Sequence, residues 1–80
     1  MADDRWGRAR MVPGEEAWRV TKAGRTMACR VRRENAGAGW EIVLTLDGEW
    51  QLGRRCLNED LARFAAESLK QDHIRGGWTE

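Results

Sequence analysis

The chain of 80 residues contains no tyrosine, one serine, one histidine and one proline. Nucleophilic catalysis needs a nucleophile, a base and a group that orients the base, all within hydrogen-bond reach. Ser68 falls in the middle of a predicted helix, and no sequence spacing supports a pairing of Cys56 with His73. The sequence therefore predicts that the protein is not an enzyme.

Metal and cofactor motifs are also absent. The two cysteines, Cys29 and Cys56, lack the CxxC spacing of a zinc site and, without an export signal, are expected to be reduced. The glycine-rich stretch 34–39 joins two predicted strands, so it offers no helix N-terminus on which a phosphate group would sit. We expect no metal and no cofactor, and we expect Cys29 to be a small apolar residue of the core.

Long apolar runs are missing too. The longest, Ile42–Leu44, is far too short to span a membrane, and residues 1–10 carry acids and arginines where a signal peptide needs an apolar stretch. The sequence predicts a cytoplasmic protein with no membrane partner. Residues 1–15 show no hydrophobic period and include Pro13-Gly14, which predicts a flexible N-terminal arm before one small domain over residues 16–80.

The sequence does contain the alternation of apolar and polar residues that is typical of β-strands. It runs through residues 17–22 and 25–33, on either side of Ala23-Gly24. A two-residue turn there pairs Val20 with Met27, so that the apolar faces of the two strands coincide. The residues of this predicted apolar face are Trp18, Val20, Met27, Cys29 and Val31.

A second hairpin is predicted around Asp47-Gly48, where two turns compete. A two-residue turn pairs Leu46 with Glu49 and sets Trp50 on the face opposite the apolar residues of the preceding strand. A three-residue loop over residues 46–48 instead pairs Leu44 with Trp50 and collects the apolar residues on one side. We therefore predict the three-residue loop.

A helix follows over residues 59–75. Asn58 is a good N-cap, acids occupy the first turn, and Gly76-Gly77 ends the helix in a left-handed cap. One apolar stripe is expected to face the sheet, made of Leu61, Phe64, Ala65, Ser68 and Leu69.

The predicted fold class is α+β, a four-stranded antiparallel β-meander with one C-terminal α-helix packed on one face. Three tryptophans, Trp18, Trp40 and Trp50, fall on the side that the helix covers. We predict that all three belong to the core, because a domain this small needs bulky residues to fill it.

Nucleic-acid binding through the open sheet face is the favoured function. Arginines on that face could follow phosphates, the arm adds three more, and Trp6 could stack on a base. The candidate residues are Arg19, Arg30, Arg32, Arg55, Arg5, Arg8 and Arg10. Against this, Glu41 and Glu49 lie on or near the same face, the net charge is only +1, and a solvated arginine-rich face gives the same pattern.

Protein interaction is the alternative function. Trp6 and Trp78 lie outside the predicted core, and an exposed tryptophan often anchors an interface. The competing interpretation is that the two ends fold back and cap the core. The partner is otherwise unknown, although the edge strands of such a sheet could also pair two copies into a homodimer.

The chain also resembles a family of small uncharacterised bacterial domains over residues 17–75. The matching residues are Trp18, Val20, Gly24-Arg25, Cys29, Gly39-Trp40-Glu41, Asp47-Gly48-Glu49 and Gly53-Arg54-Arg55, followed by an alanine-rich helix. The resemblance implies a recurring domain and carries no activity. In topology alone the predicted fold is similar to the arm-binding domains of phage integrases and to the plant ethylene-response-factor DNA-binding domain, which place an open sheet in the major groove of DNA.

Overall fold

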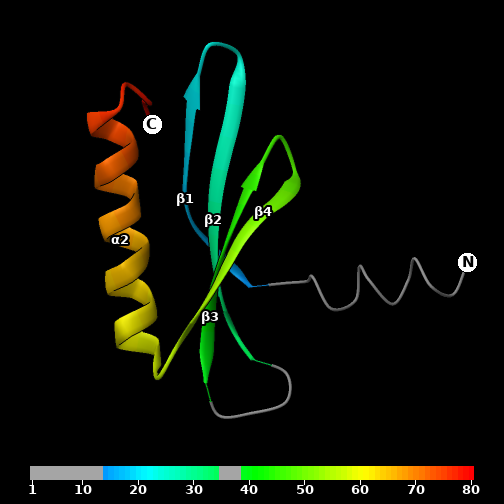
Figure 1. The fold of residues 1–80 in the computed structure, drawn as a ribbon, viewed down its shortest axis with the longest axis vertical. Coiled ribbons are helices and arrows are strands. Elements are labelled where there is room, and N and C mark those ends of the chain that lie inside the picture. Colours follow the sequence, from blue (N-terminus) through cyan, green and yellow to red (C-terminus); the bar gives the residue numbers. More distant parts are fainter. Residues whose placement is uncertain (1–13, 35–38) are drawn as a thin grey trace, which may run out of the picture.

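A computed structural model describes residues 14–34 and 39–80 and confirms the predicted α+β fold (Figure 1). The four strands form one antiparallel sheet in the order β1-β2-β3-β4, and the helix contacts all of them from one side. The elements are β1 (Glu15–Lys22), β2 (Arg25–Arg33), β3 (Trp40–Leu46), β4 (Glu49–Cys56) and α2 (Glu59–Arg75). The predicted arm, residues 1–15, lies outside the described residues except for Gly14 and Glu15, and Glu15 already begins β1.

The first hairpin is built as predicted. Ala23 and Gly24 form a two-residue turn with φ angles of 52° and 80°, the left-handed values that match the twist of a tight hairpin. Val20 pairs with Met27, and Trp18 pairs with Cys29. The apolar residues of β1 and β2 therefore share the face that α2 covers.

The second hairpin corrects the prediction. Its turn has two residues, Asp47 and Gly48, with φ angles of 53° and 87°. The strand register shifts between Leu44 and Thr45, which leaves Gln51 as an extra residue in β4. The two-residue turn places Trp50 opposite Thr45, on the open face, and the bulge then returns Leu52 to the helix side, opposite Leu44.

The tryptophans consequently have different environments. Trp18 is buried in the core, as predicted, and its indole Nε1 donates a hydrogen bond of 2.7 Å to the Ala66 carbonyl. Trp40 is half-buried against the core, with the Arg33 guanidinium 6.0 Å from its ring centroid. Trp50 is 54% exposed, so the prediction that it belongs to the core is wrong.

The core lies between the helix and the first three strands. Its fully buried side chains are Val20, Cys29, Val31 and Ile42. Burial raises the pKa of the Cys29 thiol to about 11, because a thiolate would lose its hydration there. Cys29 is therefore a core residue, as the sequence predicts.

The helix has the predicted bounds but presents a different face to the sheet. Asn58 caps it by accepting a hydrogen bond from Leu61 N at 2.9 Å, and its C-cap is Gly76 with φ −84°, while the left-handed residue is Gly77. Its buried residues are Ala62 and Ala66. Small side chains at these positions let the helix approach the bulky Trp18.

The predicted stripe on α2 is therefore only partly correct. Ala65 and Leu69 pack against the core, but Phe64 is 72% exposed, and Leu61 and Ser68 are exposed as well. The helix is rotated toward its alanines because the large side chains of β1 and β3 already fill the space beneath it. Its larger apolar residues remain on the surface.

The two edges of the sheet differ. Along β1, Thr21 and Thr79 form an antiparallel bridge, with N···O distances of 2.7 and 3.0 Å. Next to this bridge, Trp78 makes an edge contact with His73, whose ring lies 5.6 Å from that of Trp18. No strand pairs with the outer edge of β4 in the described part of the chain.

Candidate functional site: the open face of the sheet

The sheet face opposite α2 brings the four predicted strand arginines together. Arg30 pairs across the ladder with Val43, and Glu41 lies between Arg32 and Arg55 on the two neighbouring strands. Paired residues of an antiparallel ladder point to the same side, so these side chains share one face. The open-face arginines are Arg19, Arg30, Arg32 and Arg55.

Each of these arginines has a carboxylate partner. Arg19 holds both oxygens of Glu16, at 2.7 and 3.2 Å, and this hydrogen bonding lowers the pKa of Glu16 and raises that of Arg19. Arg30 lies 3.8 Å from the same Glu16 and donates a hydrogen bond of 3.0 Å to the Gly14 carbonyl. The positive charge of this edge of the face is thus partly neutralised.

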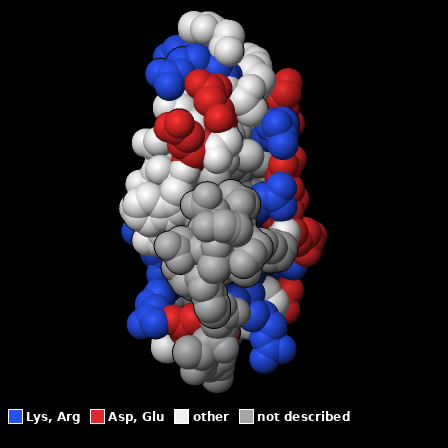
Figure 2. Space-filling view, turned by 90° about the vertical axis from the view of Figure 1, so that its right-hand side faces the viewer, with Lys and Arg blue, Asp and Glu red and all other residues white. Residues whose placement is uncertain are grey.

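The remaining two pairs differ in how far water reaches them. Arg32 donates to Glu41 through Nε at 3.0 Å and Nη2 at 2.8 Å, and its side chain is only 23% exposed. Arg55 pairs with Glu34, but its side chain is 77% exposed. Acidic and basic side chains are accordingly interspersed where Figure 2, which looks onto this face, leaves it visible.

The open face also carries an aromatic ring that the sequence prediction missed. Trp50 lies opposite Thr45, and a Cβ added at Gly53 would lie 3.4 Å from Cζ2 of the Trp50 indole. The glycine therefore leaves room for the ring to lie over the strand backbone. The preference of Asp-Gly for two-residue turns was the signal in the sequence that could have placed Trp50 here.

The other predicted site residues are distributed differently. Arg5, Trp6, Arg8 and Arg10 lie outside the described residues. Trp78 is half-buried and packs against the core, beside His73. Its predicted role in an interaction remains a prediction, and its position is that of a residue that covers the end of the core.

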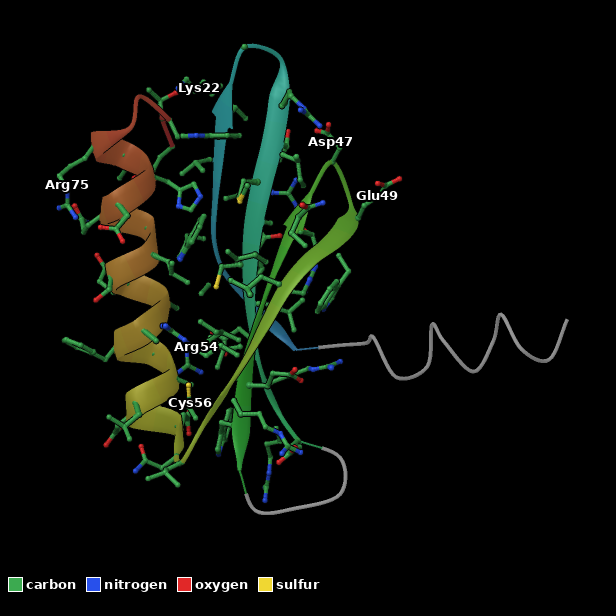
Figure 3. All side chains as sticks on the ribbon, in the orientation of Figure 1. Lys22, Asp47, Glu49, Arg54, Cys56 and Arg75 are labelled. Carbon is green, nitrogen blue, oxygen red and sulfur yellow. The ribbon has the colours of Figure 1, made fainter. Side chains whose placement is uncertain are left out.

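Hollows lie at two places beside the sheet in the described part of the molecule. One, of about 370 Å³, lies where β4 leads into the helix, close to Cys56, which is labelled in Figure 3. Its lining residues are Glu34, Gly39, Arg55, Cys56 and Leu57. It adjoins the exposed Arg55–Glu34 pair, so a ligand on that arginine would have space beside it.

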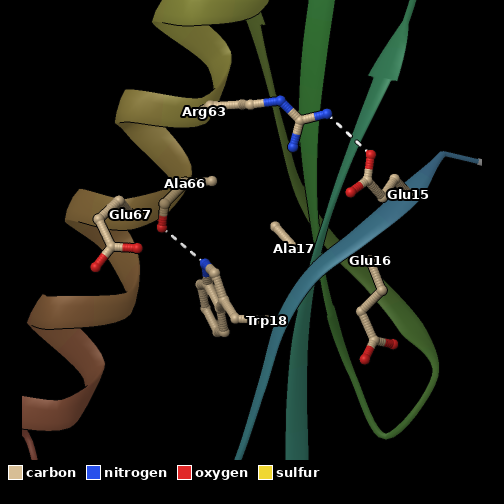
Figure 4. Close-up of a pocket in the computed structure, with 7 residues that line it drawn as sticks. All are labelled: Glu15, Glu16, Ala17, Trp18, Arg63, Ala66 and Glu67. Carbon is tan, nitrogen blue, oxygen red and sulfur yellow. Dashed lines mark hydrogen bonds and ion pairs between the residues drawn. The ribbon is translucent and has the colours of Figure 1, made fainter.

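The second hollow, of about 200 Å³, lies between β1 and α2 (Figure 4). Arg63 enters it between two acids, with nitrogen–oxygen distances of 2.9 Å to both Glu15 and Glu59. Both carboxylates compete with any incoming anion for this guanidinium. We therefore assign no ligand to this hollow.

Among residues 14–34 and 39–80, no three His, Cys, Asp or Glu side chains converge on a point that could hold a metal ion. The described part of the chain also contains no helix with the length and apolar character needed to cross a membrane. Comparison with protein-family models, with curated proteins and with solved structures finds no match to the chain.

Proposed function

We propose that the protein is a small non-enzymatic binding module that binds single-stranded nucleic acid weakly on the open face of its sheet. The observation that carries this proposal is the position of Trp50, exposed on the same face as four arginines. An exposed indole stacks on unpaired bases, and nearby guanidinium groups contact the phosphates between them. Single strands are favoured over duplexes because their bases are free to stack.

The ion pairs on this face determine which arginines are available to phosphate. Exposed ion pairs contribute little to stability because water screens them. A phosphate can therefore replace Glu34 at Arg55 at small cost, whereas the shielded Arg32–Glu41 pair would lose a better-protected partner. We assign the phosphate contacts to Arg19, Arg30 and Arg55, and a structural role to Arg32.

The test is fluorescence anisotropy of a short labelled single-stranded oligonucleotide titrated with the protein at low salt. Trp50→Ala should weaken binding by roughly five- to a hundredfold, corresponding to the ~1–3 kcal/mol of one stacked base. Trp50→Phe should retain part of the affinity. Ile74→Ala, at the far end of α2, is the control and should bind like the unchanged protein.

Salt dependence provides an independent readout of the phosphate contacts. The logarithm of the binding constant should fall linearly with the logarithm of salt concentration, and Arg55→Gln should reduce that slope by about one. Absence of binding at low salt, or affinity unchanged by Trp50→Ala, would show that the open face has no such function.

A further inference from the structure

The surface between β4 and α2 exposes an unusual concentration of apolar side chains. Leu52 lies on the helix side of β4, Leu57 lies in the link to the helix and is 82% exposed, and Leu61 and Phe64 lie in the first two helical turns. We name these four residues the β4–α2 surface. Scattered single apolar residues on a monomer need no explanation, but a cluster this close along the chain indicates an interaction site.

The strand that carries Leu52, β4, is also an edge strand of the sheet. The Thr21–Thr79 bridge occupies part of the β1 edge, whereas the outer edge of β4 has no strand partner within residues 14–34 and 39–80. An unpaired edge presents N–H and C=O groups that another extended strand can use. Leu52 lies on this unpaired strand itself, and Leu57 follows the strand directly in the chain.

The charged residues of β4 indicate which kind of partner would fit this edge. Glu49 begins the strand and Arg54 lies near its end, as Figure 3 shows, and neither forms an ion pair with another described residue. When two copies of β4 run antiparallel, the Glu49 end of each meets the Arg54 end of the other. A two-fold axis then creates two opposite-charge contacts, each between Glu49 of one copy and Arg54 of the other.

We propose that a second copy of this chain docks on the β4–α2 surface, with the two β4 edges antiparallel. The bulge at Gln51 interrupts the β4 ladder, so the strand pairing is short and the apolar side chains of both copies supply most of the association. The proposed dimer uses the outer edge and the helix side of β4, whereas the proposed nucleic-acid site uses the opposite face of the sheet, so each proposal is tested by its own variants.

Sedimentation velocity across a range of protein concentrations tests this interface. We expect a species of twice the 9.2 kDa chain mass that dissociates on dilution. Glu49→Arg and Arg54→Glu should each weaken the dimer, because each places like charges together across the two-fold axis. The double variant, Glu49→Arg with Arg54→Glu, should restore it, because the complementary contacts are re-formed in reverse.

An apolar substitution and its control complete the design. Phe64→Ser should weaken the dimer by about tenfold, the effect expected for one well-placed apolar side chain in a small interface. Ile74→Ser, on the same helix away from β4, should leave it unchanged, and circular dichroism confirms that each variant is folded. A monomer at every concentration would overturn the proposal. So would association that the single charge reversals leave intact, or large polydisperse aggregates.

Discussion

The two hairpins of this sheet have turns of the same kind, yet their outer strands differ, because β1 has buried residues and β4 has none. Both turns have two residues at positive φ, and the first hairpin contains Trp18 and Cys29 whereas the second contains Trp40, Trp50 and Cys56. In the first hairpin Trp18 and Cys29 are buried under the helix. In the second, Trp50 and most of β4 are exposed, because the bulge at Gln51 and the rotation of α2 leave that strand uncovered.

The difference shows that a sheet of this size need not be stabilised evenly. The first hairpin has the Trp18–Ala66 hydrogen bond to the helix and the Thr21–Thr79 bridge to the C-terminal segment. We infer that the core residues of β1, β2 and β3 carry most of the stability, and that β4 contributes little to it. Substitutions at matching positions of the two hairpins test this inference.

The tryptophans should give the largest contrast. Trp18→Ala should cost ~3–5 kcal/mol, because it removes a buried ring and leaves the Ala66 carbonyl without its donor. Trp50→Ala should cost less than about 1 kcal/mol, as expected for a surface substitution. Urea unfolding followed by circular dichroism measures both, and similar losses at the two positions would contradict the division of roles.

The cysteines should give an intermediate contrast. At pH 8 a thiol-specific reagent should modify Cys56 and leave Cys29 protected until the protein unfolds, because Cys29 is fully buried. The raised pKa of Cys29 adds a pH effect. Its contribution to stability is complete below the ordinary thiol pKa of 9.0 and is lost as the pH rises toward about 11.

That loss should amount to roughly 2–3 kcal/mol by pH 11, since each pKa unit corresponds to about 1.4 kcal/mol. Cys29→Val keeps the apolar packing and should lack this part of the pH dependence. Cys56→Val should retain it. Equal reactivity of the two thiols in the folded protein would show that the first hairpin is not protected by the helix.

The turns should give the smallest contrast. Ala23→Gly should stabilise the protein by a few tenths to ~1 kcal/mol, because glycine removes the strain of a positive φ at the cost of a more flexible unfolded chain. Asp47→Asn should destabilise it. The Asp47 carboxylate accepts a hydrogen bond from Thr26 N at 2.9 Å and pairs with Arg25, which together lower its pKa.

The stabilisation from Asp47 is therefore present above its ordinary pKa of 3.8 and is lost as the pH falls through the lower value of the folded state. Thermal unfolding at neutral and acid pH measures this difference. The gap between Asp47→Asn and the unchanged protein should close in acid. A constant gap would mean that the carboxylate charge does not hold the second turn to β2.

The parts of the fold that could be predicted from the sequence are those where several local signals indicate the same structure. The first hairpin, the Asn58 cap and the helix bounds each combine a period with a turn or cap residue. Trp50 was misplaced because the prediction used a longer loop to keep Leu52 on the apolar side, whereas the structure uses a two-residue turn followed by a one-residue bulge. Such a bulge leaves no mark on the apolar pattern. The helix face was ambiguous because the alanine stripe and the leucine–phenylalanine stripe overlap along α2.

The partners of the arginines could not be predicted either. Glu34 directly follows β2 and Arg55 lies on β4, so the two meet only when both strands pair with β3. The sequence identified which arginines share a face, and tertiary structure determined how much of their charge is neutralised. For these arginines, the sequence pattern indicated the face of the sheet but not which carboxylate lies next to each one.

The bridge between Thr21 and Thr79 limits how many chains can join. A sheet with two free edges can add copies at both ends and grow into a fibre, whereas a sheet with one obstructed edge has a single growing end. Two molecules that meet through β4 cover that end on each other, so growth stops at the pair. In the proposed dimer, the Thr21–Thr79 bridge, far from the β4 contact, would leave β1 less able to add a further copy.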